Sequence, residues 1–118
     1  MMEKDLQGFL DGFTIEQLDD TTDLVTTPFS DKTGSPVRIL VRRRGSQFYL
    51  SNEKNRIANH EKAGRRVDHK MREEFKLVLR RFDVYHINGE ISTEATRENL
   101  PARFRNLLQA LIMLDAMF

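Results

Sequence analysis

Residues 99–118 constrain the fold more than any other part of the chain, because they describe a helix with almost no polar side. Apolar side chains recur at steps of four, three, four, three and four residues, at Leu100, Phe104, Leu107, Leu111, Leu114 and Phe118. A helix that is apolar nearly all round is buried. We therefore predict that it forms either the centre of the core or an interface between two copies. A homodimer would form through Phe104, Leu107, Leu111 and Leu114.

The middle of the chain carries the pattern of antiparallel strands. Val37, Ile39 and Val41 alternate with Arg38, Leu40 and Arg42, which is the period-two pattern of a half-buried strand. Gly45 ends this strand, and Pro28 indicates that the preceding strand lies at an edge or ends there. We predict an antiparallel meander with a basic solvent face and with strands at 24–28, 37–43 and 46–51.

Asn88-Gly89 is the strongest short hairpin signal in the chain, and it separates the strand-like segments 84–87 and 90–93. Apolar spacing and capping residues predict three further helices, at 4–12, 52–63 and 69–82. The predicted fold class is α+β: a small antiparallel meander plus a C-terminal hairpin, packed against three to four helices, with the C-terminal helix buried. A chain of 118 residues fits a single domain, 1–118.

The near-neutral total charge of +1 hides a strong segregation along the chain. Residues 1–37 carry two Lys/Arg against eight Asp/Glu, and residues 38–81 carry fourteen against five. Residues 82–118 carry three against five. A local basic excess of this size creates a potential that steers phosphates or acidic protein surfaces toward it.

We take the basic segment 38–81 as the candidate binding surface. A set of eight side chains would supply its electrostatic contacts, with nucleic acid or an acidic partner: Arg42, Arg43, Arg44, Arg65, Arg66, Arg72, Lys76 and Arg80. On a helix over 69–82, Arg72, Lys76 and Arg80 follow one another at steps of four residues and form a basic ridge on one face. Cations spaced in this way release counterions from nucleic acid when they bind its phosphates. Base stacking has little support, because the strand offers only Phe48 and Tyr49, and alternation turns one of them inward.

Two alternatives to this interpretation stay open. The basic helix positions could be an ordinary solvated face, which needs no ligand. The acidic first third could also pair with the basic segment, within one chain or between two, and exposed pairs of this kind stabilise by only about 0–1 kcal/mol each. The eight side chains form one site only if their elements fold onto one side of the molecule.

The sequence predicts no catalytic residues, no metal site and no cofactor. There is no cysteine, and His60, His69 and His86 form no ligand motif. A small metal-dependent nuclease would have to use carboxylates such as Asp31 and Glu90. Asp31, however, fits more simply as the first residue of a turn that ends at a glycine.

We expect a cytoplasmic protein with no membrane partner. The first residues, MMEKDLQGFLDGF, are too acidic for a secretion signal. The longest apolar stretch, Leu107–Phe118, is interrupted by polar residues and is too short to span a bilayer. The absence of cysteine suits a reducing compartment.

Two long segments resemble the domain of unknown function 1828 family. They are TTPFSDKTGSPVRILVRRRGSQFYLSN at 26–52 and INGEISTEATRENLPARFRNLLQALIMLDAMF at 87–118. The segment SNEKNRIANHEKAG at 51–64 departs from the family pattern, which is more acidic and contains glycine there. The resemblance implies a bacterial, prophage or mobile-element context, and it brings no catalytic residues with it.

Together these observations predict a non-catalytic binding protein of bacterial or phage origin. It would use the basic surface of residues 38–81 to engage nucleic acid or a host nucleic-acid-handling protein. One alternative is a phage-encoded inhibitor of a host defence protein, of the anti-CRISPR kind, that acts by protein–protein binding. The other alternative is the small metal-dependent nuclease.

Overall fold

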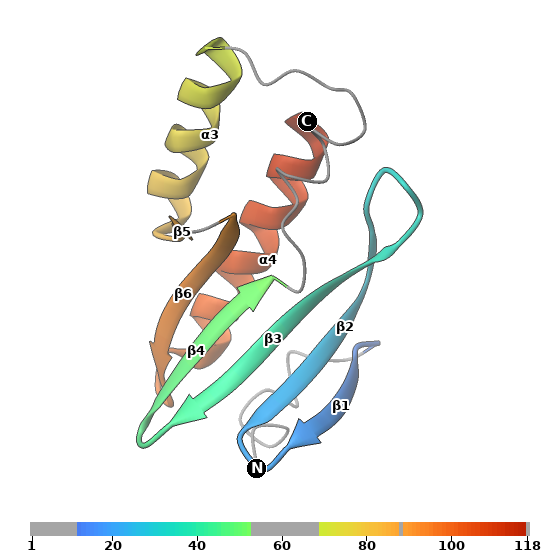
Figure 1. Ribbon diagram of the computed structural model, residues 1–118, viewed down its shortest axis with the longest axis vertical. Coiled ribbons are helices and arrows are strands. Elements are labelled where there is room, and N and C mark those ends of the chain that lie inside the picture. Colours follow the sequence, from blue (N-terminus) through green and yellow to red (C-terminus); the bar gives the residue numbers. More distant parts are fainter. Residues whose placement is uncertain (1–11, 53–68, 88, 118) are drawn as a thin grey trace.

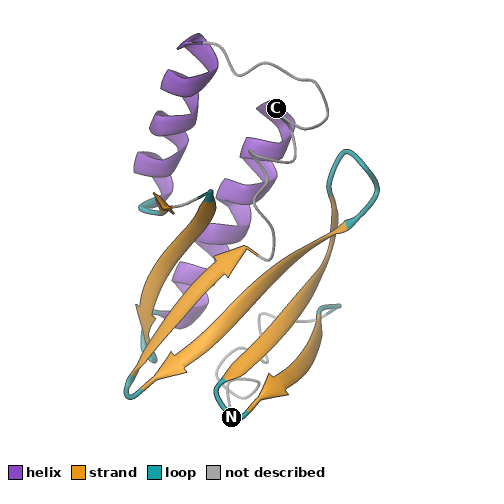
Figure 2. Cartoon of the chain, in the orientation of Figure 1, coloured by secondary structure: helices purple, strands orange, loops and turns teal. Residues whose placement is uncertain are grey.

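The computed structural model describes residues 12–52, 69–87 and 89–117, and it confirms the α+β class (Figures 1 and 2). One six-stranded sheet has the order β1-β2-β3-β4-β6-β5, and every neighbouring pair is antiparallel. The strands are β1 (Thr14–Asp19), β2 (Thr22–Ser30), β3 (Pro36–Arg44), β4 (Gln47–Asn52), β5 (Tyr85–Ile87) and β6 (Glu90–Thr96). The helices are α3 (His69–Phe82) and α4 (Leu100–Met117).

The predicted meander and hairpin are both present, but they form one continuous sheet. β6 pairs with β4 from Gln47↔Thr96 to Ser51↔Ser92, which joins the hairpin to the meander. The prediction of three to four helices is not supported, because the described residues contain two. The helices predicted at 4–12 and over nearly all of 52–63 lie outside the described residues.

β1 is the strand that the sequence did not reveal. Its side chains are mostly polar and exposed, with Ile15 half-buried and Leu18 50% exposed, so the apolar alternation is too weak to recognise. β1 covers the edge of β2, which is therefore an interior strand. Of the two expectations for Pro28, an edge strand is wrong, whereas a position near the end of the strand is correct. Pro28 lies where the β2–β3 register shifts, a position at which the missing N–H costs little pairing.

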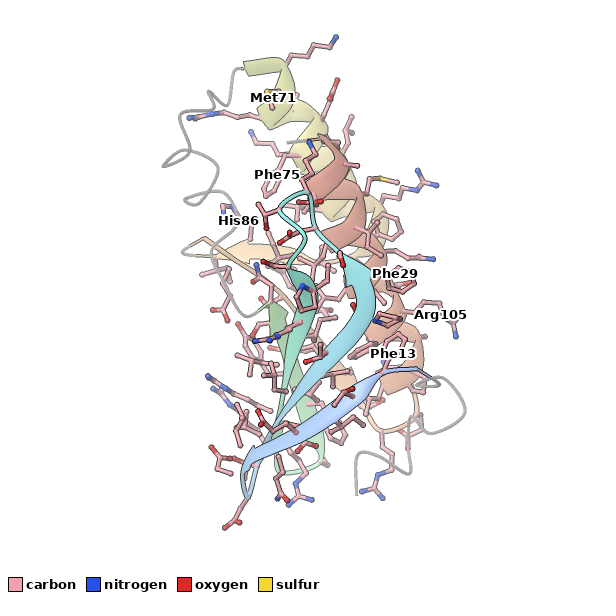
Figure 3. The ribbon with its side chains drawn as sticks, turned by 90° about the vertical axis from the view of Figure 1, so that its right-hand side faces the viewer. Phe13, Phe29, Met71, Phe75, His86 and Arg105 are labelled. Carbon is pink, nitrogen blue, oxygen red and sulfur yellow. The ribbon has the colours of Figure 1, made fainter. Side chains whose placement is uncertain are left out.

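The core lies between one face of the sheet and α4, as the apolar stripe requires. Val37, Ile39 and Val41 on β3 are at most 2% exposed, and α4 contacts β3, β4 and β6. Figure 1 shows α4 crossing behind the sheet with α3 beside it. On the β1 side, Phe13 closes the core, because its ring centroid lies 6.2 Å from that of Phe104 (Figure 3).

α3 packs against α4 and is anchored at its C-terminal end. Asp83 adopts the left-handed conformation, with φ of 54°, and the N–H of Val84 donates to the carbonyl of Leu79 at 3.0 Å. This is the Schellman arrangement that ends many helices. The Arg103 guanidinium of α4 donates to the Asp83 carboxylate at 2.6 Å, which links the two helices.

Candidate functional site

The structure separates the predicted basic residues into two groups, which we name by their elements. The strand group is Arg42, Arg43 and Arg44 at the end of β3, and the helix group is Arg72, Lys76 and Arg80 on α3. Arg65 and Arg66 lie outside the described residues. The β3–β4 turn lies at one end of the 42 Å long axis, whereas α3 begins at the other (Figure 1). The two groups therefore do not form one continuous surface.

The strand group is itself divided by the pleat of the sheet. Directly paired residues point to the same side, so Arg43 shares the core side with its partner Phe48 and is half-buried. Arg42 and Arg44 point to the opposite side and are exposed. We call this side the outer sheet face; it faces away from α3 and α4. It carries Leu40, Arg42, Arg44, Gln47, Tyr49, Ser51, Ser92, Glu94, Thr96 and, on β5, Tyr85 and Ile87. Ser51 and Ser92 are buried, and the exposed part of the face begins beyond them.

Tyr49 is the aromatic residue of this face. Phe48 is 4% exposed in the core, so alternation turns one of the two aromatic residues inward as predicted, and Tyr49 is the one that turns outward. The guanidinium carbon of Arg44 lies 5.6 Å from the centroid of the Tyr49 ring, within cation–π range. Arg42 is the direct cross-strand partner of Tyr49. One ring is thus associated with two arginines.

Glu94 on β6 completes a row across three strands, Arg42–Tyr49–Glu94. Since neighbouring strands are about 4.8 Å apart, the backbones of Arg42 and Glu94 are separated by roughly 10 Å. Both side chains are exposed, and in the described part of the chain neither makes a hydrogen bond or an ion pair. Sequence reasoning missed Glu94, because its place beside Tyr49 depends on the long-range β4–β6 pairing.

The helix group has the character of a solvated helix face. The Lys76 ammonium lies 3.6 Å from the Glu73 carboxylate one turn earlier, and both side chains are more than half exposed. Arg72 and Arg80 are also exposed. An exposed pair of this kind contributes little to stability, and it partly neutralises the ridge.

The acidic first third is not a counterpart of the helix group within the described residues. β1 forms one edge of the sheet, whereas α3 leads into β5 at the other edge. Asp19 caps its own turn instead: its carboxylate accepts from the N–H of Thr21 at 2.9 Å, and this bond lowers its pKa. The same turn lies beside the strand group, since the carbonyl of Thr21 accepts from the N–H of Arg43.

Asp31 is a turn residue, as its sequence context predicts. One of its carboxylate oxygens accepts hydrogen bonds from the N–H and hydroxyl of Thr33 and from the N–H of Ser35. Glu90 lies in the β5–β6 hairpin opposite Ile87. Over residues 12–52, 69–87 and 89–117, no group of three or more Asp, Glu and His side chains could hold a metal ion. The described residues thus give the nuclease alternative no support.

His86 is the one histidine whose surroundings the structure describes. It lies on β5 with its ring 5.1 Å from that of Phe75, edge to face (Figure 3). Partial burial beside this ring lowers the pKa of His86 below its usual value. The ring contact joins β5 to α3, and the lowered pKa favours the neutral form of His86. His60 lies outside the described residues.

The predicted self-association residues serve the core of a single copy. Phe104, Leu107 and Leu111 are fully buried, and Leu114 is 5% exposed. The core of one copy thus uses these side chains, and self-association through them stays a prediction. None of the described helices is both long enough and apolar enough to cross a membrane.

Comparison with known proteins bears on the resemblance seen in the sequence. Searches of curated proteins and of solved structures found no match to this chain. The family model described as "Domain of unknown function DUF1828" matches residues 27–114. This range includes β3, β4 and β6, and with them the row Arg42–Tyr49–Glu94. The chain belongs to the DUF1828 family.

Proposed function

We propose that the protein is a nucleic-acid-binding protein that holds a single strand on the outer sheet face. The observation that carries this proposal is the position of Arg44 over Tyr49, with Arg42 directly across from the same ring. Arginines contact phosphates, and an aromatic side chain between them offers a surface on which a base can stack. The proposal keeps the predicted partner and restricts the surface to the sheet.

A single strand fits this face better than a duplex. In a duplex the bases are already stacked on one another, and they present only their edges to a protein. In a single strand an unpaired base is free to stack on an aromatic ring or on an arginine plane. Tyr49 and Arg44 supply both kinds of partner at one point of the sheet.

Arg42 of the strand group also differs from Lys76 of the helix group in its side-chain contacts. Arg42 has no side-chain partner in the described residues, whereas Lys76 is already paired with Glu73. A cation without a protein partner gains more from a phosphate, because no existing interaction has to be broken. The helix group then contributes general positive potential without direct contact.

Binding of a labelled single strand of about 12 nucleotides, followed by fluorescence anisotropy, tests the proposal. Replacing Tyr49 by Ala removes the stacking surface, and we expect affinity to fall roughly 5- to 150-fold. Tyr49→Phe keeps the ring and is expected to stay within about threefold of the unaltered protein. Circular dichroism checks that each variant is folded.

Tyr85 provides a matched control, because it is the other tyrosine of the chain and also lies on the outer sheet face. It is 54% exposed and no arginine is paired with it across the strand. Tyr85→Ala should leave affinity unchanged. The proposal is wrong if the protein does not bind at low salt, prefers the duplex, or responds equally to the two tyrosine substitutions.

A protein partner remains the second candidate, in line with the inhibitor alternative. It is favoured by the exposed apolar side chains of β5, where Tyr85 and Ile87 are 54% and 59% exposed on the same face. In that case Tyr85→Ala would weaken the interaction and Tyr49→Ala would not. The same pair of variants therefore separates the two functions.

A further inference from the structure

The residue that faces Tyr49 from β6 is acidic, although a nucleic-acid surface normally excludes negative charge. The Glu94 side chain is exposed and, in the described part of the chain, makes neither a hydrogen bond nor an ion pair. We propose that Glu94 selects guanine as the base stacked at Tyr49. This inference rests on the proposed function and names the chemistry of its ligand.

The register of the sheet places the carboxylate within reach of such a base. Tyr49 and Glu94 are direct cross-strand partners, and the Cβ atoms of such a pair are about 4.5–5.5 Å apart. A base that stacks on the tyrosine ring, or on the adjacent guanidinium plane of Arg44, is wide enough to extend past the edge of the ring. Its edge then lies above β6, where the Glu94 side chain begins.

The arginines determine which edge of the base faces Glu94. Arg42 and Arg44 both lie on β3, on one side of Tyr49, so the sugar–phosphate backbone follows that strand. The Watson–Crick edge of a base points away from its sugar. It therefore points across β4 toward β6, which is the side where Glu94 stands.

The chemistry of the carboxylate selects among the four bases. An ionised carboxylate only accepts hydrogen bonds, and its two oxygens can accept two parallel bonds. Guanine presents two adjacent donors on its Watson–Crick edge, N1–H and the N2 amino group. Adenine and cytosine present an amino donor beside an acceptor nitrogen, and thymine or uracil presents one N–H between two carbonyl acceptors. Guanine alone satisfies both oxygens.

The test uses oligothymidylate of about 12 nucleotides, either plain or with a single central guanine, adenine or cytosine. The unaltered protein should bind the guanine-containing strand roughly 5- to 150-fold more tightly than the plain strand. Glu94→Gln keeps the size of the side chain but presents a donor, and it should abolish this preference. It should bind the plain strand at least as tightly, because one repelling charge is removed.

Glu16→Gln is the matched control, since it removes the same charge from an exposed residue of β1, which is separated from β4 by β2 and β3. It should leave the preference for guanine intact. Equal binding of all four strands overturns the guanine inference and leaves the proposed function standing. A preference that survives in Glu94→Gln overturns the role of Glu94. If no strand is bound, the proposed function itself is wrong.

Discussion

The strand group and the helix group are both positively charged, but their side chains have different neighbours. On α3, Lys76 is paired with Glu73, and the whole ridge is exposed to water. On β3, the Arg42 side chain makes no ion pair with the described residues, and Arg44 lies over an aromatic ring. A run of basic residues is therefore a candidate binding site only where neighbouring side chains, such as the Tyr49 ring, can also contact a ligand.

The two groups also differ in how firmly their backbones are held. β3 lies inside the sheet and is paired with β2 on one side and β4 on the other. α3 lies at the periphery, where Phe75 and Val78 pack inward and the Schellman turn at Asp83 fixes its end. A ligand loses less free energy on binding to cations whose positions are already fixed. This favours the strand group as the place where a ligand is held.

We expect the largest effect from a substitution that destabilises α3, the helix that carries the helix group. Phe75 is 7% exposed, and Phe75→Ala should lower the free energy of unfolding by about 3 kcal/mol, since it leaves a cavity beside His86. Urea denaturation measures this loss, and hydrogen exchange should show that α3 loses protection more than β3 and β4. Leu77→Ala, on the same helix but 61% exposed, should change stability by less than about 0.5 kcal/mol.

This variant also tests which group binds the ligand. If the strand group holds the nucleic acid, Phe75→Ala should still bind it at temperatures where the sheet stays folded. Loss of binding with an intact sheet would move the site to α3.

An intermediate effect is expected in the salt dependence of binding. For single strands, the slope of log affinity against log salt is about −0.7 per phosphate contacted. Removing two such contacts with Arg42→Ala and Arg44→Ala should make the slope shallower by about 1.4, measured between about 50 and 200 mM salt. The triple variant Arg72→Ala, Lys76→Ala, Arg80→Ala should leave the slope unchanged. If the triple variant makes the slope shallower and the double variant does not, the helix group contacts the phosphates and the strand group does not.

The smallest effect concerns pH and the junction of α3 with β5. Burial lowers the pKa of His86 in the folded protein below its ordinary value of 6.5, so protonation favours the unfolded chain. The contribution of neutral His86 is complete above about pH 6.5 and is lost as the pH falls through the lowered pKa. Thermal unfolding across this range should show a modest decline that His86→Gln removes. An identical decline in that variant would assign the effect to other groups.

Much of the fold was predictable because it depends on local periodicity. The helix over 69–82, the final helix, the Asn88-Gly89 hairpin and the strand at 37–43 each have a pattern within a few residues. β1 was not predictable, because its alternation contains a single inward apolar residue, Ile15. The β4–β6 pairing was not predictable either, because no local pattern specifies which strand a hairpin will join.

The burial of α4 follows from its own residues, since exposing a helix that is apolar nearly all round to water is unfavourable. The sequence by itself also determined that arginines line one side of β3, because strand alternation has a fixed period of two. Long-range contacts alone placed α3 away from the strand group and Glu94 opposite Tyr49. The sequence gives the sign of each charge but not the position of its side chain in space. A binding surface is formed by side chains from several strands, and long-range strand pairing decides which of them lie on the same side.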